Sequence, residues 1–547
     1  MQWRNSAYLT RLPLFRGPTG AEERVKRQMS RVMQLAKSIA GNWIAFAISV
    51  SVAFFLSPFI VHHLGNIAYG IWTLVVSMIS FMSLLDLGLR GAVTRFVARH
   101  HTQGDHLESS RAVSAAFWLR MWISLIVITA SAVMAVLSTR IFRIPVDLHL
   151  SARCAIILTG TSLALTLSFG VFGGVLVALH RFALVSCVTV IQTMLRAGGV
   201  VWLLKSGHGI LGLAIWEFTV DLFANVTLAV LCFRVYPELR ISLQRPDAAI
   251  LRQFLNYSSY VFLIHCAVQL IYYTDNLVVG FFISASAVTF YAIGGSLLEY
   301  LRQVVSSVTT VFMPLASSFE ASGEQDQLRR LLIQGTRGSI VVASPIAVAL
   351  FFRGHTFIQL WMGGQYEHIS GRVLQILLLA QVFSIANFTA GNIAYGLAKH
   401  RAFALSVLGE SISNLALSIF LVKQIGINGV AWGTVIPNLA VQLLFWPRYI
   451  CSLLKIPVPH YLWQGWIRPG LALVPFGIAC YLSDRFLTAT HLFQFFLQIA
   501  AILPIFLISI VLCFWKELAW QMRGRLGFLS KILHPGREAP KRVDLLP

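Results

Sequence analysis

Four basic side chains lie deep inside long apolar stretches of the sequence, where a charge is hardest to accommodate. They are Arg120, Arg196, His265 and Arg302. Each lies roughly 8–16 residues from the nearer end of its stretch, which corresponds to about 12–24 Å along a helix. A guanidinium group binds phosphate oxygens through two parallel hydrogen bonds. These residues are therefore candidate ligands for a phosphate-bearing group, such as a pyrophosphate, inside a membrane cavity.

Acidic residues in similar positions support a second interpretation. They are Glu217, Asp221, Asp275, Glu299 and Glu410. A charge at the centre of a bilayer costs about 2.5–3.5 kcal/mol on insertion scales, so it needs a partner of opposite charge or a wet cavity. The arginines can form structural ion pairs with these carboxylates instead of binding phosphate. The two explanations account for the charges equally well. A core hydrogen bond is the simpler role for His265.

The stretch LLDLGLRGAVTRFVARHHTQGD, residues 84–105, changes from apolar to charged within about four helical turns. Asp86 and Arg90 stand four residues apart and can pair on one helix face. Arg95 follows near the expected helix end, where its side chain can reach the membrane interface. Either these residues only end a helix, or Arg90 and Arg95 form a basic vestibule for the phosphates of a ligand.

The composition determines the class of protein that must position these charges. The chain has 547 residues, of which 57% are hydrophobic and 12% charged, and its mean hydropathy is +0.73. Soluble domains are nearer 45–50% apolar and about 25% charged. The sequence therefore predicts an all-α polytopic membrane protein without a separate soluble domain.

About fourteen stretches are long and apolar enough to span a bilayer as helices. They are expected near residues 36–61, 69–92, 111–137, 152–178, 183–204, 209–233, 254–282, 287–316, 331–352, 371–396, 402–422, 428–451, 467–484 and 491–514.

The formal charge of +22 is concentrated before the first span, after the last span and in alternate loops. The positive-inside rule then places both termini in the cytoplasm, as an even number of spans requires. A basic rim of this kind attracts anionic membrane lipids. We expect those lipids as partners and no nucleic acid, and no removable signal peptide is predicted.

Three short matches relate the two halves of the chain. They pair Gly104 with Gly323, Phe182 with Phe403, and Gly212 with Gly429, each about 220 residues apart. This spacing covers six spans, so spans 1–6 and 7–12 are predicted to be two lobes related by an axis along the membrane normal. The acidic candidates, Asp86 among them, are then ion-coupling or lobe-interface residues.

The predicted organisation has six parts. They are a basic cytoplasmic segment (1–35), an N-lobe (36–233), a cytoplasmic linker (234–253), a C-lobe (254–452), helices 13 and 14 (453–514) and a basic cytoplasmic tail (515–547).

Two segments carry a family resemblance. They are LGNIAYGIWTLVVSMISFMSLLDLGLRGAVTRFVAR and YYTDNLVVGFFISASAVTFYAIGGSLLEYLRQVVSSVTTVFMPLASSFEA. Their L-G-x-x-x-Y-G loop, D-x-G-L helix end, T-D pair and inner proline (Pro314) resemble polysaccharide flippases of the MATE-like multidrug/oligosaccharidyl-lipid/polysaccharide superfamily. Asp275 occupies the T-D position, where the resemblance implies a role at the lobe interface or in an ion-coupled cycle.

The resemblance implies a function and a location. Such flippases move undecaprenyl-pyrophosphate-linked oligosaccharides, including O-antigen or exopolysaccharide repeat units, across the bacterial inner membrane by alternating access. Polysaccharide polymerase and glycosyltransferases are the protein partners to consider.

Two alternatives stay open. A cation-coupled multidrug exporter of the same fold is favoured if acidic residues predominate in the cavity, whereas arginine is expected to predominate. A membrane glycosyltransferase or polymerase needs a sizeable external loop with acidic or His groups, and the external segments are short. Neither a cofactor nor a metal is predicted, because there is no nucleotide-binding motif and the seven cysteines are isolated.

Overall fold

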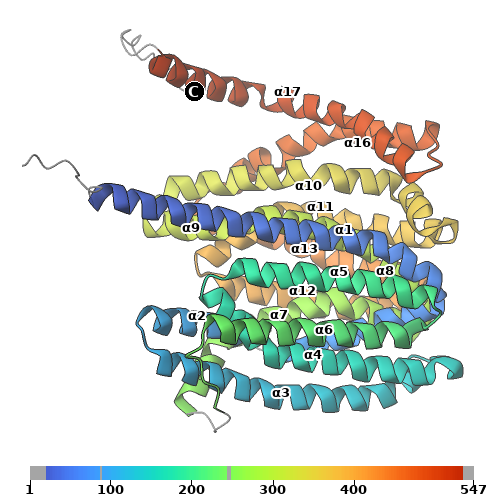
Figure 1. Cartoon of the computed structure of the whole chain (residues 1–547). Helices are drawn as coiled ribbons and strands as arrows, with labels where there is room; N and C mark the ends of the chain where they lie inside the picture. The colour runs from blue at the N-terminus through green and yellow to red at the C-terminus, as the bar shows by residue number, and fades with distance from the viewer. Residues whose placement is uncertain (1–19, 87–88, 243–247, 534–547) are drawn as a thin grey trace, which may run out of the picture.

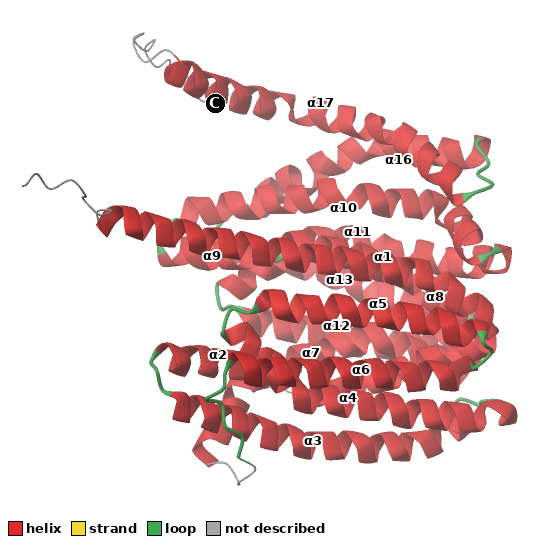
Figure 2. Ribbon diagram, in the orientation of Figure 1, coloured by secondary structure: helices red, strands yellow, loops and turns green. Residues whose placement is uncertain are grey.

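The computed structural model describes the backbone of residues 20–86, 89–242 and 248–533 and the side chains of residues 46–86, 91, 93–242, 262–399 and 401–515. All regular secondary structure in these ranges is helical (Figure 2). The prediction of an all-α protein is confirmed. The first 19 and last 14 residues, within the predicted terminal segments, lie outside the described residues.

The helices follow one another in antiparallel order (Figure 1). Those of the first half are α1 (Gly20–Met82), α2 (Leu89–Thr102), α3 (His106–Ile141), α4 (His149–Ala178), α5 (Phe182–Lys205) and α6 (Gly209–Val235). Those of the second half are α7 (Ala248–Phe282), α8 (Ala285–Thr309), α9 (Phe312–Ala321), α10 (Gln325–Met362), α11 (Glu367–Gly396), α12 (His400–Ile425), α13 (Ile427–Ala440) and α14 (Trp446–Leu454). The short α15 (Val458–Tyr461) leads into α16 (Arg468–Phe486) and α17 (Leu492–Leu533).

Thirteen segments of the described chain are long and apolar enough to cross a membrane. The first, Phe46–Asp86, has 41 residues and would be about 60 Å long as a straight helix, twice the thickness of the bilayer hydrocarbon. It breaks at Gly65, whose φ of 76° is not helical. Its two arms are therefore two crossings, and the total of fourteen agrees with the predicted number.

The two halves repeat the same order of elements. The short helix α2 follows the second arm of α1, and the short helix α9 follows α8 in the same way. After these helices come Gly104 with φ 73° and Gly323 with φ 74°, and the turns before α5 and α12 contain His180 with φ 58° and Ala398 with φ 53°. Positive φ is uncommon outside glycine, so its recurrence at corresponding turns confirms the predicted two-lobe repeat. We call α1–α6 the N-lobe and α7–α14 the C-lobe.

Hydrogen bonds join the lobes at several places along the bundle. The start of α1 and the end of α17 lie at the same end, which we call the terminal face (Figure 1). At the opposite end, Thr289 in the C-lobe donates a hydrogen bond of 2.6 Å to the carbonyl of Asn66, and Tyr366 donates to the Asn66 side chain. The indole of Trp361 donates to the carbonyl of Phe54 at 3.1 Å. These contacts hold the lobes together at the end away from the terminal face. At the other end of the second arm of α1, Gln269 of α7 donates a hydrogen bond of 2.8 Å to the hydroxyl of Ser83.

Some predicted boundaries differ from the helices. Residues 20–35, assigned to a separate N-terminal segment, belong to the same helix as the first span. The predicted inter-lobe linker ends at residue 253, but α7 begins at Ala248. The last helix continues to Leu533, beyond the predicted end of the final span. Helices project beyond the apolar stretch because polar residues can extend them outside the membrane.

Candidate functional site

A cavity of about 810 Å³ lies within the C-lobe. Its wall comes from α7, α8, α11, α12, α13 and α14, with Thr73 of α1 as the contribution of the N-lobe. On α8 the lining residues recur every three or four positions, as Tyr291, Gly295, Glu299 and Arg302 do, so one face of this helix is turned inward. The cavity extends from Tyr291 to residues near the terminal-face ends of α8 and α11.

Asp275 lies at the deep end of this cavity. Its side chain is 5% exposed, and Oδ2 accepts hydrogen bonds from the hydroxyls of Tyr291 at 2.5 Å and Thr434 at 2.7 Å. Oδ1 is buried and has no hydrogen-bond partner among the described residues. No described Lys, Arg or His side chain forms an ion pair with this carboxylate.

Glu410 of α12 is a second buried carboxylate in the cavity wall. It is 4% exposed, and Oε1 accepts a hydrogen bond of 2.6 Å from the amide of Asn438 on α13. Within the described part of the chain it forms no ion pair. Two buried carboxylates therefore line the C-lobe cavity, and neither forms an ion pair with a described side chain.

Arg302 is the arginine of the cavity, and it is already engaged. It forms an ion pair with Glu299 on the preceding turn of α8, and its guanidinium carbon lies 3.3 Å from the ring centroid of Tyr272. Gln303 donates to the second carboxylate oxygen of Glu299 at 3.0 Å. This arrangement corresponds to the structural ion pair that the sequence left open for Arg302.

The charge balance of this cavity differs from the sequence-based expectation. Among the described residues its charged lining consists of Asp275, Glu299, Glu410 and Arg302, so described carboxylates outnumber described arginines by three to one. The expectation that arginine would predominate is wrong for this cavity. Depth along a helix predicted which charges are embedded, but not the helix rotation that brings particular charges together.

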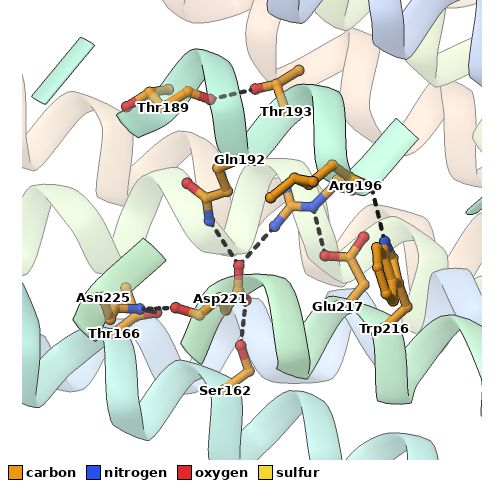
Figure 3. Close-up of polar contacts among 11 residues, drawn as sticks. Ser162, Thr166, Thr189, Gln192, Thr193, Arg196, Trp216, Glu217, Asp221 and Asn225 are labelled. Atoms are coloured by element: carbon orange, nitrogen blue, oxygen red, sulfur yellow. Dashed lines mark hydrogen bonds and ion pairs between the residues drawn. The ribbon is translucent and has the colours of Figure 1, made fainter. Parts of the chain in front are cut away.

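A second charged network lies inside the N-lobe, between α4, α5 and α6 (Figure 3). Arg196 forms ion pairs with Glu217 at 2.6 Å and with Asp221 at 2.9 Å. Asp221 also accepts hydrogen bonds from Gln192, at 2.8 Å, and from Ser162. Figure 3 shows the side chains of Arg196, Gln192 and Ser162 converging on the Asp221 carboxylate. Arg196, Glu217 and Asp221 are brought together as an ion-paired cluster.

Asp86, in the charged stretch of residues 84–105, takes part in neither the C-lobe cavity nor the Arg196 network. Asp86 forms an ion pair with Arg120 of α3, and the buried Arg120 donates a second hydrogen bond, of 2.8 Å, to the carbonyl of Leu167. The α-helix ends at Met82 and a 3₁₀ turn contains Asp86. The predicted pairing of Asp86 with Arg90 required a continuous helix, and this prediction of a continuous helix is wrong.

Three predicted residues remain, Arg90, Arg95 and His265. The side chain of Arg90 is outside the described residues, although its backbone belongs to α2. Arg95 is exposed on the same helix. His265 is exposed on α7, so a core hydrogen bond is the wrong explanation for it. The structure does not gather the predicted basic residues into one phosphate-binding cluster within its described part.

Several polar residues of the cavity were missed by reasoning from charge. Gln381, Ser384 and Asn387 of α11 all line it. Their spacing of three residues places them on one helix face, and this recurrence of polar residues in an apolar stretch was the available signal. Amides carry no charge, so they do not stand out in a search for embedded ions.

Arg353 was also missed as a buried charge, because the sequence placed it in a loop. It is fully buried in α10 and forms an ion pair with Asp484 of α16 at 3.8 Å. It also donates hydrogen bonds to Ser483 at 2.9 Å and to Gln498 of α17 at 2.7 Å. This arginine ties the final helix pair to the C-lobe.

Comparison with known proteins gives a family match and several relatives. A family model described as polysaccharide biosynthesis protein matches residues 63–371. The chain is similar to the uncharacterized membrane protein EpsK of Bacillus subtilis (strain 168), with 22% identity over 455 residues that cover 81% of this chain and 88% of that protein. It is also similar to a probable low-salt glycan biosynthesis flippase of Haloferax volcanii, with 22% identity over 435 residues, 79% of this chain and 87% of that protein.

Solved structures share the fold. The lipid II flippase MurJ in an inward closed conformation matches with a TM-score of 0.69 at 15% identity, covering 88% of this chain and all of that one (100%). An inward-facing multidrug resistance MATE family transporter of the MOP superfamily matches with a TM-score of 0.63 at 12% identity, covering 75% of this chain and 95% of that one. At these identities the similarity is one of architecture, and it agrees with the predicted MATE-like fold.

Proposed function

The chain belongs to the polysaccharide biosynthesis protein family, and on that premise we propose that it moves a lipid-linked glycan from one leaflet of a membrane to the other. One structural observation carries the proposal: a cavity of about 810 Å³, lined by both polar and apolar side chains, inside a bundle of membrane-spanning helices. A cavity of this size falls within the range of about 300–1,000 Å³ that is usual for ligand sites. Its polar groups, such as those of Gln381 and Asn387, offer hydrogen bonds to a glycan that the bilayer does not.

The finer form of the proposal names the lipid and the membrane. The substrate is an undecaprenyl-pyrophosphate-linked oligosaccharide, such as an O-antigen or exopolysaccharide repeat unit, and the membrane is the bacterial inner membrane with both termini in the cytoplasm. The basic residues of the terminal-face loops support this orientation. The terminal face is then the side from which the substrate enters.

Alternating access is the proposed mechanism. The N-lobe and C-lobe contact each other near Asn66, at the end opposite the terminal face. Breaking these contacts while new ones form at the terminal face moves the opening from one side of the membrane to the other. This motion needs no covalent chemistry, in keeping with the flippase named among the relatives, and it makes a glycosyltransferase or polymerase the weaker alternative.

Asp275 is the proposed coupling residue. Its carboxylate is buried between α7, α8 and α13, with one oxygen unpartnered and no described cation beside it. An isolated buried carboxylate is costly, so a proton or a metal cation that neutralises it stabilises this packed arrangement. Binding and release of that cation therefore bias the C-lobe between two states.

The acidic cavity supports a second candidate function, cation-coupled drug export. The excess of described carboxylates over arginine in the cavity wall, Asp275, Glu299 and Glu410 compared with Arg302, would attract a cationic drug. The test offers both substrates to the same proteoliposomes: a fluorescent undecaprenyl-pyrophosphate oligosaccharide and ethidium. We expect the lipid to change leaflet and ethidium to stay outside. Ethidium movement with a stationary lipid would overturn the flippase proposal in favour of drug export.

A further inference from the structure

The C-lobe cavity has unpaired polar atoms that the translocation mechanism has not used. We propose that this cavity receives the sugar portion of the substrate and selects uncharged sugars over acidic ones, with the pyrophosphate remaining outside it. This proposal rests on the proposed function, because it presupposes a lipid-linked glycan. It adds the place where the glycan is held and the chemical class of sugar that is accepted.

Three buried side chains in the cavity wall each have a polar atom without a hydrogen-bond partner in the described part of the chain. The atoms are Nε2 of Gln381, Oδ1 of Asn387 and Oδ1 of Asp275, and their residues are 8%, 5% and 5% exposed. Leaving such a buried atom unpaired is unfavourable, because it has lost its hydrogen bonds to water. A hydroxyl group both donates and accepts hydrogen bonds, so a sugar can satisfy the unpaired donor and both acceptors.

The amides are held in place by neighbours on α13 and the π-helical turn that follows it. Asn387 donates to both the backbone carbonyl and the side-chain oxygen of Gln442, at 2.9 and 2.8 Å. Ser384 donates to Asn438 at 2.8 Å, and Asn438 in turn donates to Glu410. Because the amide hydrogens of Asn387 are already used, its unpaired oxygen is fixed as an acceptor. A preorganised site of this kind loses less entropy when it binds a ligand.

Aromatic rings line the part of the cavity that approaches the terminal face. The rings of Tyr395 and Phe403 have centroids 4.9 Å apart, and those of Phe403 and Trp446 are 5.5 Å apart. Aromatic side chains supply apolar contact area with an electron-rich face, which suits the C–H face of a sugar ring. Amides in one part and rings in another match a ligand that has both hydroxyl groups and apolar faces.

The charges of the cavity determine which sugars fit. Three carboxylates and one arginine of the described chain line it, and Arg302 is already paired with Glu299. A uronic acid or a phosphate would bring a further negative charge close to Asp275 and Glu410, and like charges repel strongly where water is excluded. An uncharged hexose or N-acetylhexosamine meets no such repulsion.

The experiment compares two lipids and two amide variants in proteoliposomes. The lipids are a fluorescent undecaprenyl-pyrophosphate disaccharide of uncharged sugars and the same lipid with a terminal uronic acid. The variants are Gln381→Leu and Asn387→Leu. The matched control is Gln375→Leu, on the same helix but outside the cavity lining, where the amide bonds to the carbonyl of Phe351. We expect about tenfold slower movement of the uncharged lipid in both cavity variants, near-native movement in the control, and little movement of the acidic lipid.

A second readout measures occupancy directly. Ser306 lines the cavity, and in a Ser306→Cys variant the new thiol is modified with a methanethiosulfonate reagent; modification of the native cysteines is subtracted. We expect the uncharged lipid to slow this modification and the acidic lipid to leave it unchanged. Protection without lipid movement in the native chain would support the sugar site while overturning the flippase function. Native movement that both leucine variants preserve, or equal protection by the two lipids, would overturn the sugar site alone.

Discussion

The hydroxyl of Tyr291 donates a 2.5 Å hydrogen bond to the carboxylate of Asp275, joining α8 to α7 at the deep end of the C-lobe cavity. Thr434 of α13 donates to the same oxygen. Three helices therefore meet on one carboxylate. A change in its protonation or cation occupancy alters the packing of all three, which is the basis for the predictions about transport.

Replacing Asp275 with asparagine removes the charge and keeps the side-chain shape. We expect transport to fall about tenfold or more and to stop responding to imposed proton or sodium gradients, because the coupling charge is lost. Tyr291→Phe removes one hydrogen bond to a charged acceptor, worth about 1.5–3 kcal/mol, and should weaken coupling less completely. Asp147→Asn, at an exposed carboxylate outside the cavity, is the control. A gradient-dependent Asp275→Asn variant would rule out this residue as the coupling site.

The Arg196 cluster can be tested as an ion pair or as a phosphate ligand. Arg196→Met leaves Glu217 and Asp221 without their cation, so we expect a loss of about 1–3 kcal/mol in the free energy of unfolding, measured by thermal denaturation in detergent. The triple variant Arg196→Met/Glu217→Gln/Asp221→Asn removes all three charges and should recover both stability and lipid movement. A triple variant that is stable yet moves no lipid would assign Arg196 to substrate binding.

Arg353 is predicted to anchor the final helix pair. Arg353→Met removes its bonds to α16 and α17, and Arg353→Lys cannot reproduce the forked geometry of a guanidinium. Both variants should lower the thermal midpoint and make the loop between α16 and α17 more accessible to protease. Arg372→Met, at an exposed arginine of α11, should change neither. Unchanged protease sensitivity in the Arg353 variants would contradict the anchoring role.

Gly70 permits the close approach of the second arm of α1 to α8. A Cβ atom built on Gly70 would lie 1.8 Å from the carbonyl oxygen of Ala285, so Gly70→Ala must push the lobes apart there. We expect less disulfide cross-linking between cysteines placed at Asn66 and Thr289, which are hydrogen-bonded in the native chain. Gly198→Ala, where a Cβ meets nothing within 4 Å, is the matched control. Equal cross-linking in both variants would show that the close approach of Gly70 to Ala285 does not hold the two lobes together at this end.

The fold was largely predictable because membrane helices leave a strong signal. Apolar stretches of about twenty residues predicted the fourteen crossings, and matches such as Gly104 with Gly323 predicted the repeat that their shared positive φ confirms. The kink at Gly65 was predicted as a loop between two spans, which the φ of 76° supports. Helix ends were less predictable, since polar residues extend several helices beyond the apolar stretch.

The site was predictable only in part. Embedded residues such as Asp275 and Arg196 were identified by their cost in a bilayer, but their partners depend on helix rotation and on contacts between distant segments. Asp86, for example, pairs with Arg120 of another helix. Uncharged residues such as Asn387 were not singled out, because a single amide in an apolar helix is compatible with ordinary helix packing.

The central claim is most directly tested by the initial rate at which a fluorescent undecaprenyl-pyrophosphate oligosaccharide changes leaflet in proteoliposomes of the native chain. An impermeant quencher reports the fraction in the outer leaflet, and protein-free liposomes give the background rate. The account predicts a rate at least about tenfold above background, with a further response to an imposed proton or sodium gradient. A rate equal to background under every gradient, with folded protein and a panel of such lipids, would contradict it.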